Sequence, residues 1–510
     1  MRPLSYGNTS LVFVGAALAC LPFADIVISV LSPGAELKRV IGGILRPDFL
    51  SVEIWSVIWT VAFAVVGVGL GAIAGLAMAL AYPHVRLVHV LAVTLRSIHE
   101  LFWALLLMQV FGLGPVTGVL AVALPYAGYF AKVYAEIIEE ADLAAVRALP
   151  SGTSTLSAFA FARLPELAMQ FQTYALYRLE CGMRSTLVLG FIGLPTIGFH
   201  LEGYFKQGLY AQAAALLAMF YILIGTRRLW ARPSTLPLLV IASLALLPAG
   251  VGGGSTLDNL ARFLTIDIIP APLRGADLLA PATWGAFGGW LYPLLVKQAL
   301  PGIVDTLVLG QIALVCAALL SLTSFPLVSW RFMGRLGHPA GRVLLVVVRS
   351  TPEYMMAYVL LQILGPSMLP AIIALAVHNG GIVGYLMGRH SDQLEMRADA
   401  PKRRADLYSY EVVPRLYGQF MAYMLYRWEI IIRESAIFGI LGVTTLGFYV
   451  DAAISELRLD AAVVLIGVTV LLTAAVDLLS RRLRAALRIG TLPTRLSTHR
   501  ATVNAAHQLT

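Results

Sequence analysis

The sequence predicts an all-α polytopic membrane protein with about twelve transmembrane helices, arranged as two parallel six-helix repeats. Three observations predict this fold class. The 510 residues are 59% hydrophobic and only 13% charged, whereas soluble domains carry about 25% charged residues. Mean hydropathy is +0.80, and the apolar runs are long enough for helices rather than barrel strands. The third observation is an internal repeat, which implies two related halves.

The repeat is clearest in one stretch, which we call the signature. Residues 174–199 read YALYRLECGMRSTLVLGFIGLPTIGF, and residues 423–448 read YMLYRWEIIIRESAIFGILGVTTLGF. Both copies carry Tyr-x-Leu-Tyr-Arg-x-Glu, an arginine four residues after the glutamate, and three glycines at the same spacing. Upstream, Arg96-Ser97 with Glu100 matches Arg349-Ser350 with Glu353. We therefore expect one half over residues 1–232 and the other over residues 233–510.

The apolar runs predict six helices in each half. In the first half they cover about 10–31, 54–81, 87–111, 115–133, 174–199 and 208–225. In the second half they cover about 236–249, 304–325, 343–364, 367–387, 423–448 and 461–479. The segment of about 250–300 contains three consecutive glycines, several prolines, Trp284 and Trp290. It is expected to be an extracytoplasmic loop with interfacial aromatic residues, with room for a short amphipathic helix.

Lysine and arginine gather on one side of the twelve predicted spans. The positive-inside rule then places both termini in the cytoplasm, together with two charged stretches at about 139–165 and 389–414. In the first stretch, Pro150 and Gly152 separate two short helical patterns, which predicts a compact cytoplasmic knob. The three cysteines lie in apolar runs and are expected to be small core residues rather than a disulfide framework.

Charged side chains inside the predicted helices are the main candidates for function. Each costs about 2.5–3.5 kcal/mol at the bilayer centre on insertion scales, so it usually faces protein or a water-filled path. Glu180 can pair with Arg184 one helical turn later, and Glu429 can pair with Arg433 in the same way. The candidates for a translocation path or for intramembrane pairing are Arg96, Glu100, Arg178, Glu180, Arg184, Arg349, Glu353, Arg427, Glu429 and Arg433.

Two interpretations of these residues stay open. In one, the arginines form a cationic ring around a central path for an anion, with Arg96 and Arg349 about ten residues inside their helices. In the other, the charges pair structurally, for example Arg178 with Glu100 in the first half and the matching pair in the second. Insertion cost alone does not separate the two.

No enzyme motif is present in the sequence. A Gly-rich loop followed by Lys-Ser/Thr is missing, so we expect no ATP hydrolysis by this chain. No His, Cys and Asp residues stand at metal-ligand spacing, and the histidines, including His99 and His378, are scattered. We therefore expect no bound metal or cofactor, no catalytic residue and no nucleic-acid partner.

The stretch at 139–165 resembles a known motif. With Ala144-Ala145 and Gly152 before a helix that ends at Leu164-Pro165, it resembles the EAA loop of binding-protein-dependent ABC importer permeases. The signature, with Arg-Ser-Ile-x-Glu upstream and Gly-Leu-Gly-Pro at 112–115, resembles the phosphonate-type (PhnE-like) branch of that family. The chain is thus similar to two such permeases fused head to tail.

This resemblance implies a type I ABC importer (MetI-like) permease fold in a bacterial cytoplasmic (inner) membrane. Two permease copies would form a path for phosphonate, phosphate or phosphite. Each EAA loop would dock on a cytoplasmic ABC ATPase, with two ATPase copies holding ATP and Mg. An extracytoplasmic substrate-binding protein would deliver the small anionic solute.

The resemblance also assigns docking residues, and the second half departs from the pattern. In the first half these are Ala144, Ala145, Gly152 and Thr153; in the second they are Ala400, Pro401 and Arg403. A proline replaces the first half's glycine and a basic run replaces a neutral one, so we expect altered docking there. His99 stands where the family has proline, which Pro352 retains.

Other functions stay open at this point. One is an ABC importer permease for another small solute such as an amino acid, another is a secondary transporter with two six-helix halves, and a third is a scaffold that transports nothing. The long paired cytoplasmic stretches and the EAA-like loop favour the ABC importer.

Overall fold

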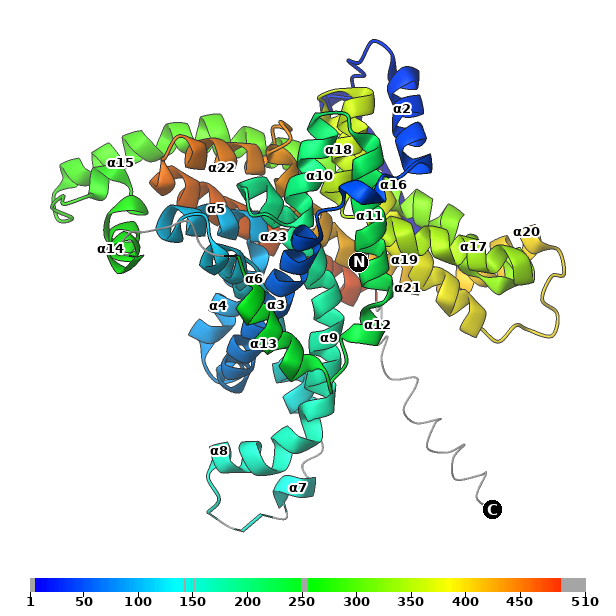
Figure 1. Ribbon diagram of the computed structural model, residues 1–510, viewed down its shortest axis with the longest axis horizontal. Helices are drawn as coiled ribbons and strands as arrows, with labels where there is room; N and C mark the ends of the chain where they lie inside the picture. The colour runs from blue at the N-terminus through cyan, green and yellow to red at the C-terminus, as the bar shows by residue number, and fades with distance from the viewer. Residues whose placement is uncertain (1–4, 142–143, 148, 151, 249–255, 488–510) are drawn as a thin grey trace.

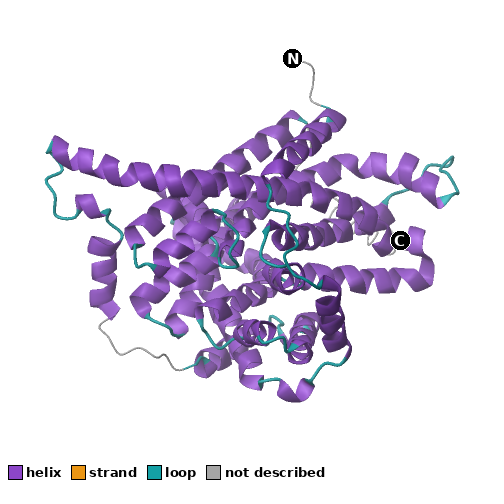
Figure 2. Ribbon diagram, turned by 90° about the horizontal axis from the view of Figure 1, so that it is seen from above, coloured by secondary structure: helices purple, strands orange, loops and turns teal. Residues whose placement is uncertain are grey.

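The computed structural model describes residues 5–141, 144–147, 149–150, 152–248 and 256–487, and within these ranges it contains helices and no strand (Figures 1 and 2). Six helices are long and apolar enough to cross a membrane, or up to nine when each of three bent helix pairs is taken as one span. Three shorter apolar helices have 10–17 residues. The chain is a multi-pass membrane protein, and this criterion stops short of the predicted twelve spans.

The first half begins with α1, which is not part of the repeated order, and it includes two of the three bent helix pairs. Its helices are α1 (Tyr6–Cys20), α2 (Pro33–Leu45), α3 (Ile54–Ala81), α4 (Arg86–Ser97), α5 (Glu100–Phe111), α6 (Pro115–Glu140), α7 (Ala144–Arg147), α8 (Thr155–Ala158), α9 (Leu164–Val188), α10 (Ile197–Lys206), α11 (Tyr210–Gly225) and α12 (Arg227–Trp230).

The second half repeats this order from α16 onward. Its helices are α13 (Leu236–Leu246), α14 (Thr256–Arg262), α15 (Pro281–Leu294), α16 (Leu300–Val328), α17 (Trp330–Ser350), α18 (Glu353–Leu364), α19 (Met368–Gln393), α20 (Arg404–Asp406), α21 (Val413–Glu434), α22 (Leu446–Ser455) and α23 (Leu459–Ala486).

The two halves are interlocked rather than separate. In the first half α3 packs along α6, and in the second α16 packs along α19. The leading helices cross over: α1 packs on α16 and α21 of the second half, and α13 packs on α3 of the first. At one crossing the Ser10 and Tyr417 hydroxyls lie 2.7 Å apart, and Gln311 Nε2 donates to the Phe13 carbonyl at 2.9 Å. The predicted boundary at 232 therefore refers to the repeat in the sequence. The two halves do not form separate bodies in space.

The predicted helices 87–111 and 343–364 are each broken near the middle. The axes of α4 and α5 differ by 98°, and those of α17 and α18 by 91°. At the second break, Thr351 has an extended backbone because the residue before a proline avoids the helical region, and Pro352 then caps α18. At the first break His99 takes the same place, and its ring nitrogen accepts from the Leu101 N–H at 3.2 Å.

The repeated glycines explain a second break inside each signature. Gly193 and Gly442 have φ of 94° and 86°, the left-handed region that glycine adopts readily. A Cβ on Gly198 would overlap the Leu187 carbonyl, and one on Gly447 would overlap the Ala436 carbonyl. The chain thus turns tightly out of α9 into α10, with a bend of 55°, and out of α21 into α22. The continuous signature helices that we predicted are wrong at this point.

Two further predictions differ from the structure. The predicted loop of about 250–300 contains α14 and is helical again from Pro281, because α15 passes through a π-helical turn at Leu295–Ala299 into α16 and forms one helix as far as Val328. Residues 249–255 lie outside the described residues. The predicted first helix of 10–31 ends at Cys20, and a short 3₁₀ turn containing Pro22 follows. A proline cannot donate the backbone hydrogen bond that would continue the helix there.

Candidate functional site

The two signatures meet at a polar cavity of about 230 Å³ between the halves, here called the central cavity. Its walls come from α5, α6 and α9 of the first half and from α18, α19 and α21 of the second. Seven charged side chains line it: Glu100, Arg178, Arg184, Glu353, Arg427, Arg433 and Glu434. Six of these seven belong to the predicted set, and Glu434 does not.

The helix breaks bring two of the acidic residues to this cavity. Glu100 is the first residue of α5 and Glu353 the first of α18, so each carboxylate lies at a helix N-terminus. Backbone N–H groups without helical partners and the helix dipole both stabilise negative charge there. This placement offsets part of the cost of holding a carboxylate at membrane depth.

The second arginine of each signature crosses to the other half. Arg184 Nη1 donates to the Arg349 carbonyl at 3.3 Å, and Arg433 Nη1 donates to the Arg96 carbonyl at 3.2 Å. Both acceptors are in the last turn of a helix that ends at a break, where carbonyls lack helical partners. The arginines thus bind the two halves together and still line the cavity. Among the ion pairs of the described residues, Glu180 pairs with Arg227 rather than with the predicted Arg184, and the predicted pair of Glu429 with Arg433 is not found.

The first arginine of each signature also departs from the predicted pairing. Arg178 donates to the Tyr174 hydroxyl at 2.7 Å and lies over the Tyr129 ring at 4.5 Å, instead of pairing with Glu100. Arg427 donates to Asn379 Oδ1 at 3.3 Å, instead of pairing with Glu353. Both guanidinium groups are held by neutral polar or aromatic partners, which leaves their positive charge directed to the cavity.

The carboxylate of the first half accepts a hydrogen bond from a neutral group. The Ser185 hydroxyl donates to Glu100 Oε1 at 2.7 Å. The Tyr126 hydroxyl lies 3.2 Å from the same serine oxygen and extends this chain of hydrogen bonds. Since a serine hydroxyl has one proton, the tyrosine is the donor of that second bond.

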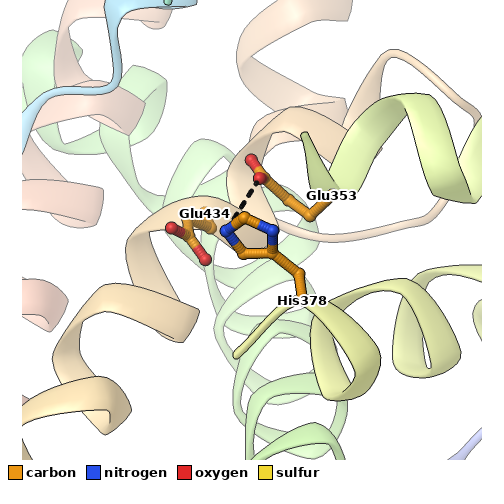
Figure 3. Close-up of side chains that lie close together, drawn as sticks. All are labelled: Glu353, His378 and Glu434. Carbon is orange, nitrogen blue, oxygen red and sulfur yellow. Dashed lines mark ion pairs between the residues drawn. The ribbon is translucent and has the colours of Figure 1, made fainter. Parts of the chain in front are cut away.

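The matching place in the second half holds an acidic cluster with a histidine. Glu353, His378 and Glu434 have side-chain ligand atoms within 4.8 Å of one another (Figure 3). Glu353 Oε2 and His378 Nε2 are 3.8 Å apart, and Asn379 Nδ2 donates to Glu434 Oε2 at 3.2 Å. Two carboxylates and an imidazole are ligands that a divalent metal accepts, so the set is a candidate metal or proton site.

Four of the predicted residues lie outside the central cavity. Arg96 and Arg349 stand in the last turns of α4 and α17 rather than deep inside continuous helices. Their Nε atoms are buried without a hydrogen bond in the described structure, and the Arg349 guanidinium lies over the Tyr385 ring at 4.4 Å. Glu180 pairs with Arg227 at 3.6 Å. Glu429 is partly buried on α21.

The two predicted docking segments lie at the outer ends of separate helix pairs, with α7 and α8 at the foot of Figure 1 and α20 at its right. In the first half, Ala144 and Ala145 begin α7, and Gly152 has φ of 99°. Thr153 bonds the Pro150 carbonyl through both its N–H and its hydroxyl, at 3.2 and 2.8 Å. Residues 142–143, 148 and 151 of this segment lie outside the described residues.

The segment of the second half is fastened by ion pairs. Ala400 and Pro401 lie in the loop after α19, and Arg403 is the exposed N-cap of α20. Glu411 contacts Arg415 at 2.5 Å and Arg397 at 3.4 Å. Burial tends to raise the pKa of the Glu411 carboxyl, but the hydrogen bond from Arg415 and the charge of Arg397 outweigh it and lower the pKa.

Comparisons with known proteins agree with the repeat. The phosphate-import permease protein PhnE of Mycolicibacterium smegmatis is 26% identical over 478 residues, which is 87% of this chain and 86% of that protein. The phosphite transport system permease protein PtxC of Stutzerimonas stutzeri is 30% identical over 230 residues, 43% of this chain and 84% of that protein. The chain belongs to the family of these phosphate-import and phosphite transport system permeases. A single permease that aligns with less than half of the chain fits a fusion of two permease copies.

A third relative extends the same likeness over a shorter range. The putative phosphite transport system permease protein HtxE of Stutzerimonas stutzeri is 35% identical over 131 residues, 26% of this chain and 50% of that protein. No protein-family model matches the chain, and no solved structure matches it. The family assignment therefore comes from the individual relatives.

Sequence reasoning missed His378, Glu434, Asn379 and Tyr129. The expectation of scattered, isolated histidines is wrong for His378, which lies beside two carboxylates. Glu434 follows Arg433 directly and replaces the serine of the first signature, so a position-by-position comparison of the two copies could have found it. Asn379 and Tyr129 carry no such signal, because only the packing of α19 and α6 places Asn379 beside Arg427 and Glu434 and brings Tyr129 to the cavity.

Proposed function

We propose that this chain is the pathway-forming permease subunit of a binding-protein-dependent ABC importer for a phosphorus oxyanion, namely phosphonate, phosphate or phosphite. The observation that carries the proposal is the pair of crossing arginines, Arg184 and Arg433, which place one guanidinium from each signature at a single cavity. The names of the relatives supply the solute class. Guanidinium groups suit an oxyanion because their N–H donors match its oxygen atoms.

The same cavity suits alternating access between two interlocked halves. Each crossing bond joins a signature arginine to a backbone carbonyl at a helix break, so a relative rotation of the halves would change both bonds together. Few hydrogen bonds would hold an anion in this cavity. A bound anion would therefore be held weakly enough to leave. A site that held the anion too tightly would stall its release.

Energy for this cycle would come from partner subunits. In our proposal two copies of a cytoplasmic ABC ATPase bind ATP and Mg and dock on the two charged segments. Their docking residues are Ala144, Ala145, Gly152, Thr153, Ala400, Pro401 and Arg403. An extracytoplasmic substrate-binding protein delivers the anion to the opposite side. The position of α7, α8 and α20 at the outer ends of their helix pairs supports this docking (Figure 1).

The finer architecture also belongs to the proposal. We propose twelve crossings in a type I importer (MetI-like) arrangement, in which the bent pairs and the short apolar helices complete spans that length and composition alone leave short. Both termini would lie in the cytoplasm of a bacterium, and the chain in its inner membrane. The parallel order of α3 to α11 and α16 to α23 supports two parallel repeats.

The test is the ATPase activity of the chain reconstituted in liposomes with its ATPase and its binding protein. Methylphosphonate, phosphate, phosphite and methionine are titrated in turn. We expect one phosphorus oxyanion to stimulate ATP hydrolysis. Stimulation by methionine alone would keep the importer and reject the anion, whereas failure of any ATPase to associate would reject the importer.

A further inference from the structure

We propose that the central cavity selects an oxyanion that still carries a P–OH proton, and that Glu353, His378 and Glu434 accept the hydrogen bond from it. This inference rests on the proposed function and adds a recognition rule to it. The three residues are called the acceptor cluster. They lie on α18, α19 and α21 of the second half, and their side chains lie close together (Figure 3). All three line the cavity.

The protonation of His378 follows from its other neighbour. His378 Nδ1 is 2.8 Å from the backbone carbonyl of Thr351, and a carbonyl can only accept a hydrogen bond. Nδ1 therefore carries the hydrogen, and in the neutral ring Nε2 presents a lone pair. This side chain is only 2% exposed, and Nε2 faces the two carboxylates. Nε2 of the neutral ring and the carboxylate oxygen atoms of Glu353 and Glu434 are thus the acceptors of the cluster.

Few of the described protein donors reach the cluster. The 3.8 Å between Glu353 Oε2 and His378 Nε2 is too long for a hydrogen bond. The Asn379 amide group donates to one oxygen of Glu434 and to the Leu375 carbonyl, so both its hydrogens are used. A ligand O–H placed among these acceptors would supply a further hydrogen bond.

The same cavity also offers hydrogen-bond donors for the negatively charged oxygen atoms of the anion. Four guanidinium groups and three carboxylates line it, which leaves an excess of one positive charge when all are ionised. A singly charged anion balances that excess. Arg184 and Arg433 each have several N–H donors and spend few of them on protein partners. The cavity therefore offers both a donor side and an acceptor side.

This pairing distinguishes phosphorus oxyanions from sulfate. Phosphoryl groups lose their second proton near neutral pH, so a form that carries a P–OH is abundant there. Sulfate has only acceptor oxygens at that pH and would place them against two carboxylates and a lone pair. A site built to bond a ligand O–H rejects analogues that lack it. The same guanidinium groups oppose a divalent cation in the acceptor cluster.

The acceptor cluster exists in the second half alone. Ser185 stands where the second signature has Glu434, and it already bonds Glu100. The matching helix α6 has Pro125 at the position of His378. The anion would therefore bind in one orientation, with its hydroxyl toward the second half, although the backbone around it is nearly two-fold symmetric.

Phosphorus NMR of methylphosphonate tests the inference, with the full chain in lipid nanodiscs. Line broadening reports weak binding, and phosphate or sulfate is added as competitor. We expect phosphate to compete at least about tenfold better than sulfate, the size of one charge-assisted hydrogen bond. Glu353→Gln and Glu434→Ser should each lose most of this preference while still binding oxyanions. Glu429→Gln, on the same helix α21 but outside the cavity, is the matched control and should keep it.

The outcomes separate the inference from the function on which it rests. Sulfate competing as well as phosphate with the wild-type chain, or both variants keeping the preference, would overturn the inference alone. Binding of neither anion would reject the proposed function. Thermal stabilisation by Zn²⁺ that disappears in both variants would show that the cluster holds a metal, which also overturns the inference. The thermal unfolding temperature of each variant shows that it is folded, and Glu434→Ser introduces the residue that the first half already accommodates.

Discussion

The two signatures build the same backbone and different chemistry. Each turns at a left-handed glycine, and each sends an arginine to a carbonyl at the helix break of the other half. In the first copy Ser185 donates to Glu100, whereas in the second Glu434 and His378 stand beside Glu353 at the cavity. The comparison teaches that the repeat fixes geometry, and that single substitutions within it assign separate tasks to the two walls.

The docking segments differ in a related way. The hydrogen bonds described around Gly152 are local, such as those of Thr153 with the Pro150 carbonyl. In the second half, Glu411 joins Arg397 to Arg415, and Arg331 donates to the Leu394 carbonyl at 2.6 Å. Among the described residues, the hydrogen bonds of the first segment are local, whereas side-chain ion pairs fasten the second.

The shared backbone is expected to show the largest effect. Gly198→Ala and Gly447→Ala each place a Cβ onto a backbone carbonyl, so each should destabilise the fold by at least about 1–3 kcal/mol and lower the yield of folded protein equally. Thermal unfolding of the purified chain measures this. Gly203→Ala is the control, because its nearest neighbour is the Gln207 side chain at 3.9 Å. Tolerance of one alanine and not the other would break the equivalence of the two turns.

The crossing arginines are expected to show the next largest effect. Arg184→Gln or Arg433→Gln removes a charge from the cavity and a charge-assisted bond of about 1.5–3 kcal/mol between the halves. ATP-driven uptake of labelled phosphite into proteoliposomes should fall by about tenfold or more in each variant. Arg39→Gln, at an exposed pair with Glu36, should transport normally. Normal uptake by either cavity variant would show that its arginine does not act on the anion.

The docking segments should respond unequally. Gly152→Leu places its Cβ in open space but forces a φ of 99° on a residue with a side chain, at a cost of about 1–2 kcal/mol. We expect it to uncouple uptake from ATP hydrolysis while membrane levels stay unchanged. Pro401→Gly should have a smaller effect, because ion pairs hold that segment. Equal loss in both variants would indicate equivalent docking.

The smallest expected effect is a pH dependence at Glu411. Because the pKa of this carboxyl is lowered in the folded chain, its contribution to stability is present above the unfolded pKa and is lost as the pH falls through the folded pKa. The thermal unfolding temperature of Glu411→Gln should therefore lie below wild type at neutral pH and approach it in acid. A difference that stays constant with pH would mean that the loss is one of packing.

The sequence predicted the helical membrane class, the two-fold repeat and six of the seven charged residues at the cavity, because insertion cost makes intramembrane charges conspicuous. The helix breaks were missed in both halves, although the sequence carries a signal for one of them. Pro352 signals a break, but His99 at the matching place does not, since only its side-chain cap reveals it. The pairings were wrong because one-turn spacing describes a lone helix, whereas Arg184 and Arg433 reach another half.

Native Cys181 offers the most direct test of the central claim that the cavity between the signatures is the path of the anion. It lines the cavity, and Arg184 Nη2 lies 3.5 Å from its sulfur. With Cys20 and Cys316 replaced by alanine, a small sulfonate-bearing thiol reagent should modify Cys181, and methylphosphonate should slow the reaction. Modification that methylphosphonate leaves unchanged, in a chain that still transports it, would place the path elsewhere.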